Sequence, residues 1–213
     1  MTVMLERRSS TEEPRKRIRP WSGSASFQEL CRTLLEMKVP DGYRTEIIGG
    51  NIVMSPFQRG YYHFAMEHLE EQLRPHLPKG HTVGSRPFLF AFPEQDRVYG
   101  PDTYVVDREV FRTADRLLDG ASLALVAELT SPSTAGTDWG DKLRVYGHAG
   151  VPVHLVLHAA DATATVFWQP TPEGYAERST VPYGEKLHIP APFDFELDTA
   201  EFGELPEAAP ESG

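Results

Sequence analysis

The feature that most constrains the fold is a series of short strand-like runs in the middle of the chain. Each run is rich in β-branched or aromatic residues, which favour extended structure. The expected strands are Thr82 to Arg86, Phe88 to Phe92, Thr103 to Val106 and Leu123 to Leu129. Helical patterns precede and follow this series. The sequence therefore predicts an α/β (α+β) fold with a mixed central sheet flanked by helices.

Helices are expected at three places around that sheet. They run from a Ser24 or Ser26 cap to about Met37, from about Tyr61 to His76, and from about Asp138 to His148. Apolar residues at helical spacing indicate the first helix, and Gly150 is a typical stop for the third.

Hairpins and one further strand complete the expected elements. The segment Arg44 to Met54 reads as two strands around Gly49-Gly50, a tight turn that needs positive φ. Val153 to Leu157 is expected to return as a strand. A second hairpin is expected from Thr163 to Gln169 and from Tyr175 to Thr180.

Length and composition favour one ordinary domain with polar tails. We expect a single domain over residues 21–205, a disordered basic tail over 1–20 and a disordered acidic tail over 206–213. The single cysteine, Cys31, excludes an internal disulfide and a cysteine-based zinc cluster. Because the first twenty residues are charged and no apolar run is long enough to cross a bilayer, we expect a cytoplasmic protein without membrane attachment.

The net charge of -10 argues against a protein that coats nucleic acid electrostatically. An enzyme with a locally basic groove is still compatible with this charge. The one dense basic stretch, from Arg15 to Arg19, could contact phosphates, but such a run is more often a solvated arm.

Two acids stand at informative places in the strands. Asp102 follows Gly100-Pro101, and Glu128 closes the apolar run that begins at Leu123. A buried carboxylate is costly unless it is paired, hydrogen-bonded or bound to a cation. Taken alone, each acid is more often a cap or half of a surface ion pair. Together on adjacent strands, they would form an oxygen-ligand site for a hard divalent ion, and their repulsion predicts a raised pKa for at least one.

The expected helix after Glu128 adds a third element. Asp138, Lys142 and Tyr146 recur every four residues and so share one helix face, from which Lys142 could point back at the strand ends. The alternative is an Asp138–Lys142 ion pair on a solvated helix, worth only about 0.3–0.5 kcal/mol.

At these residues the chain resembles the Uma-two (Uma2) family of restriction-endonuclease-like proteins, which is placed in the PD-(D/E)XK nuclease superfamily. The resemblance covers roughly Arg44 to Gln169, and its most specific part is Glu128-x-x-Ser131-Pro132-Ser133-Thr134 with the later Asp138, Lys142 and Tyr146. The other matching positions are Thr45 to Gly50, Ser55-Pro56, His63, Gly100-Pro101-Asp102 and Gly150-Val151-Pro152.

The resemblance implies a fold in which Asp102 begins one core strand and Glu128 lies on the next. Mg²⁺ or Mn²⁺ would be held by these two acids and the backbone carbonyl of Leu129. The superfamily's usual lysine lies two residues after the second acid, where this chain has Thr130. The family pattern implies that Lys142 takes its place.

Three further positions carry weaker implications from the family pattern. Glu46 matches an acid before the early hairpin and would add another carboxylate. His63 matches a histidine early in a helix, and Tyr146 belongs to the motif of the later helix.

The chain departs from the family in the strand after Gly150-Val151-Pro152. The family tends to have an aromatic-rich strand ending in an acid, whereas this chain has Val153-His154-Leu155-Val156-Leu157-His158. His154 and His158 alternate onto one face and could mimic a metal pair, although no third ligand is identifiable.

The implied function is metal-dependent hydrolysis of DNA phosphodiester bonds, with Lys142 positioning the attacking water or stabilising the transition state. A homodimer is expected, because cutting two strands favours paired active sites. Two alternatives remain: a non-catalytic oligomeric or protein-binding module on the same fold, and a phosphodiesterase acting on small nucleotides. The acidic net charge is compatible with both.

Overall fold

The computed structural model describes residues 22–57, 60, 62–130 and 138–203 of the chain. The expected tails, 1–20 and 206–213, lie outside the described residues, as does the motif segment 131–134. Among the described helices, none is long and apolar enough to cross a membrane.

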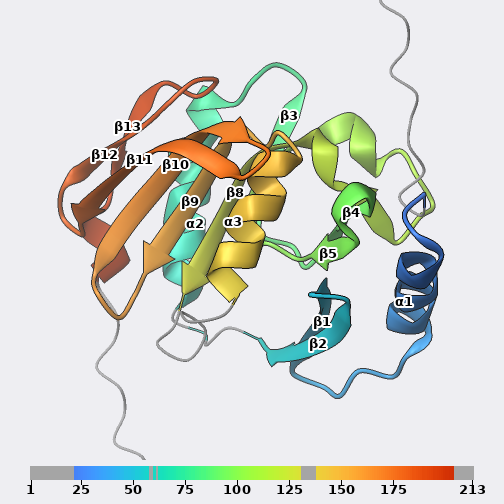
Figure 1. The fold of residues 1–213 in the computed structure, drawn as a ribbon. Helices are drawn as coiled ribbons and strands as arrows, with labels where there is room; N and C mark the ends of the chain where they lie inside the picture. Colours follow the sequence, from blue (N-terminus) through green and yellow to red (C-terminus); the bar gives the residue numbers. More distant parts are fainter. Residues whose placement is uncertain (1–21, 58–59, 61, 131–137, 204–213) are drawn as a thin grey trace, which may run out of the picture.

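The larger sheet has six strands in the order β11-β10-β9-β8-β6-β3 (Figure 1). Its strands are β3 (His81–Gly84), β6 (Thr103–Asp107), β8 (Leu123–Thr130), β9 (Val153–His158), β10 (Thr163–Thr171) and β11 (Gly174–Pro182). Only β8 and β9 pair in parallel within this sheet, and the other pairs are antiparallel. The sheet is therefore mixed, as predicted.

A smaller sheet of five strands lies beside it in the order β2-β1-β5-β4-β7. Its strands are β1 (Tyr43–Ile48), β2 (Asn51–Pro56), β4 (Leu89–Phe92), β5 (Arg97–Tyr99) and β7 (Leu117–Asp119). A separate pair is formed by β12 (Lys186–Ile189) and β13 (Phe195–Asp198). Gly49 and Gly50 have φ of 57° and 76°, which confirms the tight β1–β2 turn.

Within the described residues, three α-helices cover these sheets: α1 (Ala25–Glu36), α2 (Tyr62–Leu73) and α3 (Asp138–His148). Figure 1 shows α2 and α3 on opposite faces of the larger sheet. Because both faces of β8 are covered, its first seven residues are all buried, which explains its nearly continuous apolar sequence. Helix α1 packs on the smaller sheet, and the Ser24 hydroxyl caps it by accepting the Phe27 N–H at 3.1 Å.

Differences from the predicted elements are confined to ends and short pieces. Helix α2 gives way at Arg74 to the 3-10 turn η1 (Arg74–His76), because Pro75 cannot donate a backbone hydrogen bond. The predictions did not include β5, β7, β12 and β13, which have only three or four residues each. The remaining 3-10 turns are η2 (Pro93–Gln95), η3 (Arg108–Phe111), η4 (Gly120–Ser122) and η5 (Ala200–Gly203).

Candidate active site

Strand pairing brings the two predicted acids together. Strands β6 and β8 are antiparallel with Thr103 opposite Ala127, so Asp102, just before β6, lies level with Glu128. The Leu129 N–H donates to Asp102 Oδ2 at 2.8 Å, which holds this carboxylate at the end of β8. Both acids are buried, with side chains only 3% and 7% exposed.

Helix α3 directs Lys142 and Tyr146 at Glu128. Lys142 Nζ donates to Glu128 Oε2 at 3.0 Å, and the Tyr146 hydroxyl donates to Glu128 Oε1 at 2.9 Å. Both residues are buried. The alternative of an ion pair on a solvated helix face is therefore wrong for Lys142, and the side chain of Asp138 lies outside the described residues.

Strand β1 of the smaller sheet supplies a third buried carboxylate, Glu46. Its Oε1 accepts the Gly100 N–H at 2.8 Å and lies 3.3 Å from Lys142 Nζ. Glu46 therefore helps to hold the lysine in place and links the smaller sheet to helix α3.

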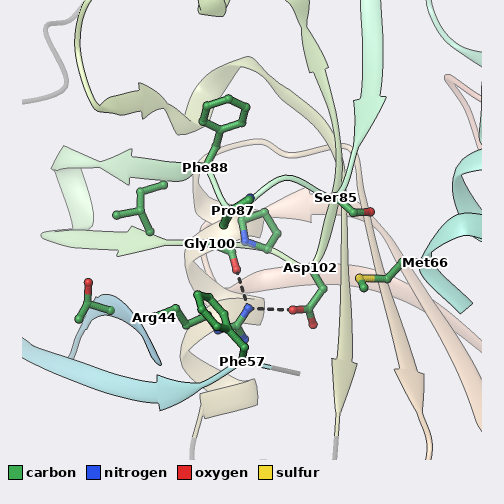
Figure 2. A pocket seen from close by; sticks show the side chains of 11 residues that line it. Arg44, Phe57, Met66, Ser85, Pro87, Phe88, Gly100 and Asp102 are labelled. Atoms are coloured by element: carbon green, nitrogen blue, oxygen red, sulfur yellow. Dashed lines mark hydrogen bonds and ion pairs between the residues drawn. The ribbon is translucent and has the colours of Figure 1, made fainter. Parts of the chain in front are cut away.

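Arg44 is a member of this cluster that the sequence analysis did not identify. It donates to Asp102 Oδ1 at 2.8 Å and to the Gly100 carbonyl at 3.2 Å (Figure 2). Arg44 and Glu46 lie two residues apart on β1, so they share a face. That alternation is the signal by which Arg44 could have been found once Glu46 was selected.

A second group anchors the start of α3, and the sequence analysis did not identify it either. Asp141 Oδ2 accepts hydrogen bonds from Arg97 Nε at 2.7 Å and from the Tyr99 hydroxyl at 2.8 Å. The ammonium of Lys142 lies 5.5 Å from the centre of the Tyr99 ring. This group fixes the turn of helix that carries Lys142. Arg97 and Tyr99 share a face of β5, but no sequence pattern links them to Asp141.

The electrostatics of the cluster follow from its composition. Three buried carboxylates, from Glu46, Asp102 and Glu128, face two cations, from Arg44 and Lys142. Burial raises the pKa of Glu128 to about 7; attraction to Lys142 opposes this, and repulsion by Asp102 and Glu46 adds to it. The predicted direction is confirmed, but burial rather than carboxylate repulsion is the main cause.

Burial acts on the pKa of Lys142 in the opposite direction. Burial alone would lower the pKa of its ammonium, but attraction to Glu128 and Glu46 outweighs burial and raises this pKa. The lysine is therefore positively charged at neutral pH, which suits a fixed charge better than a general base.

Two predicted positions remain to be placed, His63 and the backbone carbonyl of Leu129. His63 is exposed on α2, where its nearest acidic partner is Glu67 at 4.0 Å. For Leu129, the structure gives the N–H contact to Asp102, and a role for its carbonyl stays a prediction.

The histidine pair on β9 does not form a metal site in the described part of the chain. His154 is fully buried, and its ring contacts those of Tyr146, Phe167 and Tyr175. His158 lies 3.2 Å from the Thr130 hydroxyl. The described residues contain no group of three or more His, Cys, Asp and Glu side chains that could hold a metal.

The Asp102–Glu128 pair nevertheless fits a hard divalent ion. Mg²⁺ typically uses one or two carboxylates together with waters and substrate phosphate. Each oxygen of the Glu128 carboxylate accepts one hydrogen bond, from Lys142 or from Tyr146, and a carboxylate has about four lone-pair sites. Acceptor capacity therefore remains, and the excess of carboxylates over cations favours a positive ion.

Comparisons with known proteins give a fold neighbour and a family for this chain. A crystal structure from Anabaena variabilis, described as "a putative nuclease belonging to DUF820", is similar with a TM-score of 0.63 and 14% sequence identity; the match covers 79% of this chain and 94% of that one. At that identity the likeness shows the fold alone. No curated protein matches the sequence. The family model Uma2, described as "Putative restriction endonuclease", matches residues 26–200, which include every member of the cluster. The chain therefore belongs to the Uma2 family.

Proposed function

We propose that this protein is a metal-dependent endonuclease that hydrolyses phosphodiester bonds in DNA. The observation that carries the proposal is the buried contact of Lys142 with Glu128, next to Asp102. A lysine beside two strand-end carboxylates is the combination that the restriction-endonuclease-like families use. In this chain the lysine comes from a helix instead of the usual strand position, which Thr130 occupies.

Asp102, Glu128 and the backbone carbonyl of Leu129 would hold Mg²⁺ or Mn²⁺. When bound, the ion would make a water more acidic and neutralise charge on the phosphate.

Lys142 supplies a preorganised positive charge. Its ammonium is held between Glu128 and Glu46, so little reorganisation is needed when negative charge develops on the phosphate. Tyr146 orients Glu128 by its hydrogen bond to the other carboxylate oxygen. These contacts support a role for Lys142 in transition-state stabilisation or water positioning, and positioning roles for Glu46 and Tyr146.

The test is a cleavage assay with Mg²⁺ or Mn²⁺ on double-stranded, single-stranded and nicked DNA beside small phosphodiesters. Glu128→Gln and Asp102→Asn should abolish cleavage. Asp107→Asn, at the opposite end of β6 from Asp102, is a matched control and should leave it intact. Cleavage of small phosphodiesters alone would favour the small-nucleotide enzyme. No hydrolysis of any substrate would favour the non-catalytic module.

A homodimer and a cytoplasmic location also remain parts of the proposal. Paired sites would suit cutting of both DNA strands, and closed two-fold assemblies are the commonest oligomers. Sedimentation of the purified protein tests the dimer, and a monomer at micromolar concentration would refute it.

A further inference from the structure

A pocket of about 430 Å³ opens beside the carboxylate cluster (Figure 2). Its walls are mainly apolar, from Phe57, Met66, Pro87, Phe88 and Leu89. Arg44 and Asp102 also line it, so the pocket adjoins the proposed site of hydrolysis. Its size is within the range of small-ligand sites, in which apolar walls surround a few polar groups.

Two features of this pocket indicate the chemistry of its occupant. The Phe57 ring is a large apolar group left 52% exposed at the pocket. The Nε of Arg44 is buried and has no hydrogen-bond partner among the described residues, although the same guanidinium bonds Asp102. The pocket thus combines an aromatic surface with the guanidinium of Arg44, whose side chain is 22% exposed.

The charge of the whole chain bears on the same question. With a net charge of -10, the protein can neutralise few phosphates, so contacts to the DNA backbone alone would bind weakly. Stacking of bases on aromatic side chains provides affinity that does not depend on net charge. An apolar pocket beside one arginine suits a nucleotide whose base is not paired or stacked within a DNA duplex.

We propose that this pocket receives an unpaired nucleobase of the substrate strand, with the adjoining phosphate at Arg44. The inference rests on the proposed nuclease function and narrows its substrate class to single-stranded or locally unpaired DNA. In a continuous duplex the base would first have to unstack and unpair, which disfavours that substrate.

The test is binding, measured by fluorescence anisotropy in EDTA and again in millimolar Ca²⁺. The two probes are labelled (dT)12 and a 12-residue abasic strand with the same backbone charge. Wild-type protein should bind (dT)12 at least about fivefold more tightly, because stacking contributes a comparable or larger factor per base. A (dT)12·(dA)12 duplex should compete poorly.

Phe57→Ala should weaken (dT)12 binding by about 5- to 100-fold and leave the abasic strand unaffected, whereas Phe57→Tyr should retain binding. The matched control is Phe64→Ala, because Phe64 is 64% exposed but does not line the pocket. Equal affinity for the two probes, no binding of either, or an unchanged Phe57→Ala protein would overturn the inference.

Failure of the nuclease proposal has a different signature. In that case the base-dependent binding and its loss in Phe57→Ala persist, but no strand is cut with Mg²⁺ or Mn²⁺. If instead duplex and abasic strands are cut as readily as (dT)12, the nuclease proposal stands and the base pocket is wrong.

Discussion

Replacing Glu128 by glutamine should make the metal-free protein more stable at high pH but not at low pH. The pKa of Glu128 is raised from 4.5 to about 7, mainly by burial. The folded protein therefore holds this proton more tightly than the unfolded chain does. This tighter proton binding stabilises the folded protein fully below pH 4.5, and the stabilisation is lost as the pH rises to about 7. Glutamine keeps nearly the same shape and never ionises.

The size of the effect follows from the difference between the pKa of Glu128 in the unfolded chain, 4.5, and in the folded protein, about 7. Each pH unit between the two pKa values corresponds to about 1.4 kcal/mol, so the ionised wild type loses about 3 kcal/mol relative to Glu128→Gln. For a domain of this size, that amounts to roughly 6–12 °C in melting temperature. The difference between the two proteins should be near zero at pH 4.5 and reach this value by pH 8.

Melting curves in EDTA from pH 4.5 to pH 8 measure that difference directly. Asp141→Asn is the control, because hydrogen bonds from Arg97, Tyr99 and Arg144 outweigh burial and lower the pKa of Asp141 from 3.8 to about 2. Stability from Asp141 is present above pH 3.8 and lost as the pH falls to about 2, so this variant should differ from wild type by a constant amount across the window.

A second series of curves with millimolar Mg²⁺ or Mn²⁺ tests the metal site. Binding to the folded state alone stabilises wild type by about 2.7 kcal/mol at a hundred times Kd, and Glu128→Gln should lose this gain. The reasoning is refuted if Glu128→Gln is less stable than wild type at pH 8 in EDTA and still responds to metal. Glu128 would then be a structural acid.

Three other changes should have distinct results. Lys142→Ala should lower turnover by at least about a hundredfold while Mn²⁺ affinity, measured by calorimetry, stays nearly intact; wild-type turnover would leave the lysine a purely structural role. Deletion of residues 1–19 should leave DNA binding weak and steeply dependent on salt, as in wild type, and loss of cleavage with an intact fold would show that Arg15 to Arg19 matter. His154→Phe should be neutral or stabilising by about 1–3 kcal/mol, because neither ring nitrogen of His154 has a hydrogen-bond partner among the described residues. Burial lowers the pKa of His154 to about 3, so wild type loses stability as the pH falls from 6.5 towards 3, and acid melting curves should show a smaller loss for His154→Phe.

Local sequence patterns were sufficient to predict the elements that depend on neighbouring residues. Helix α3 runs from Asp138 to His148 as predicted, because helical spacing and a following glycine are properties of neighbouring residues. The β1–β2 turn at Gly49-Gly50 was equally readable, since few other residues adopt positive φ. The very short strands β5 and β7 have too few residues to show a period, and they form only because β4 and β1 provide partners.

The residues of the candidate site fall into the same two groups, those found from local sequence patterns and those brought together by packing. A spacing of four placed Lys142 and Tyr146 on one helix face, and the ends of two expected strands indicated Asp102 and Glu128, which the family resemblance also includes. The partners of that helix face depend on packing, because the pairing of β6 with β8 and the approach of β1 bring together residues far apart in the chain. Arg44 joins the cluster for this reason alone. Helical and strand periods describe which side of an element a residue occupies, whereas contacts between elements depend on how the apolar faces pack together.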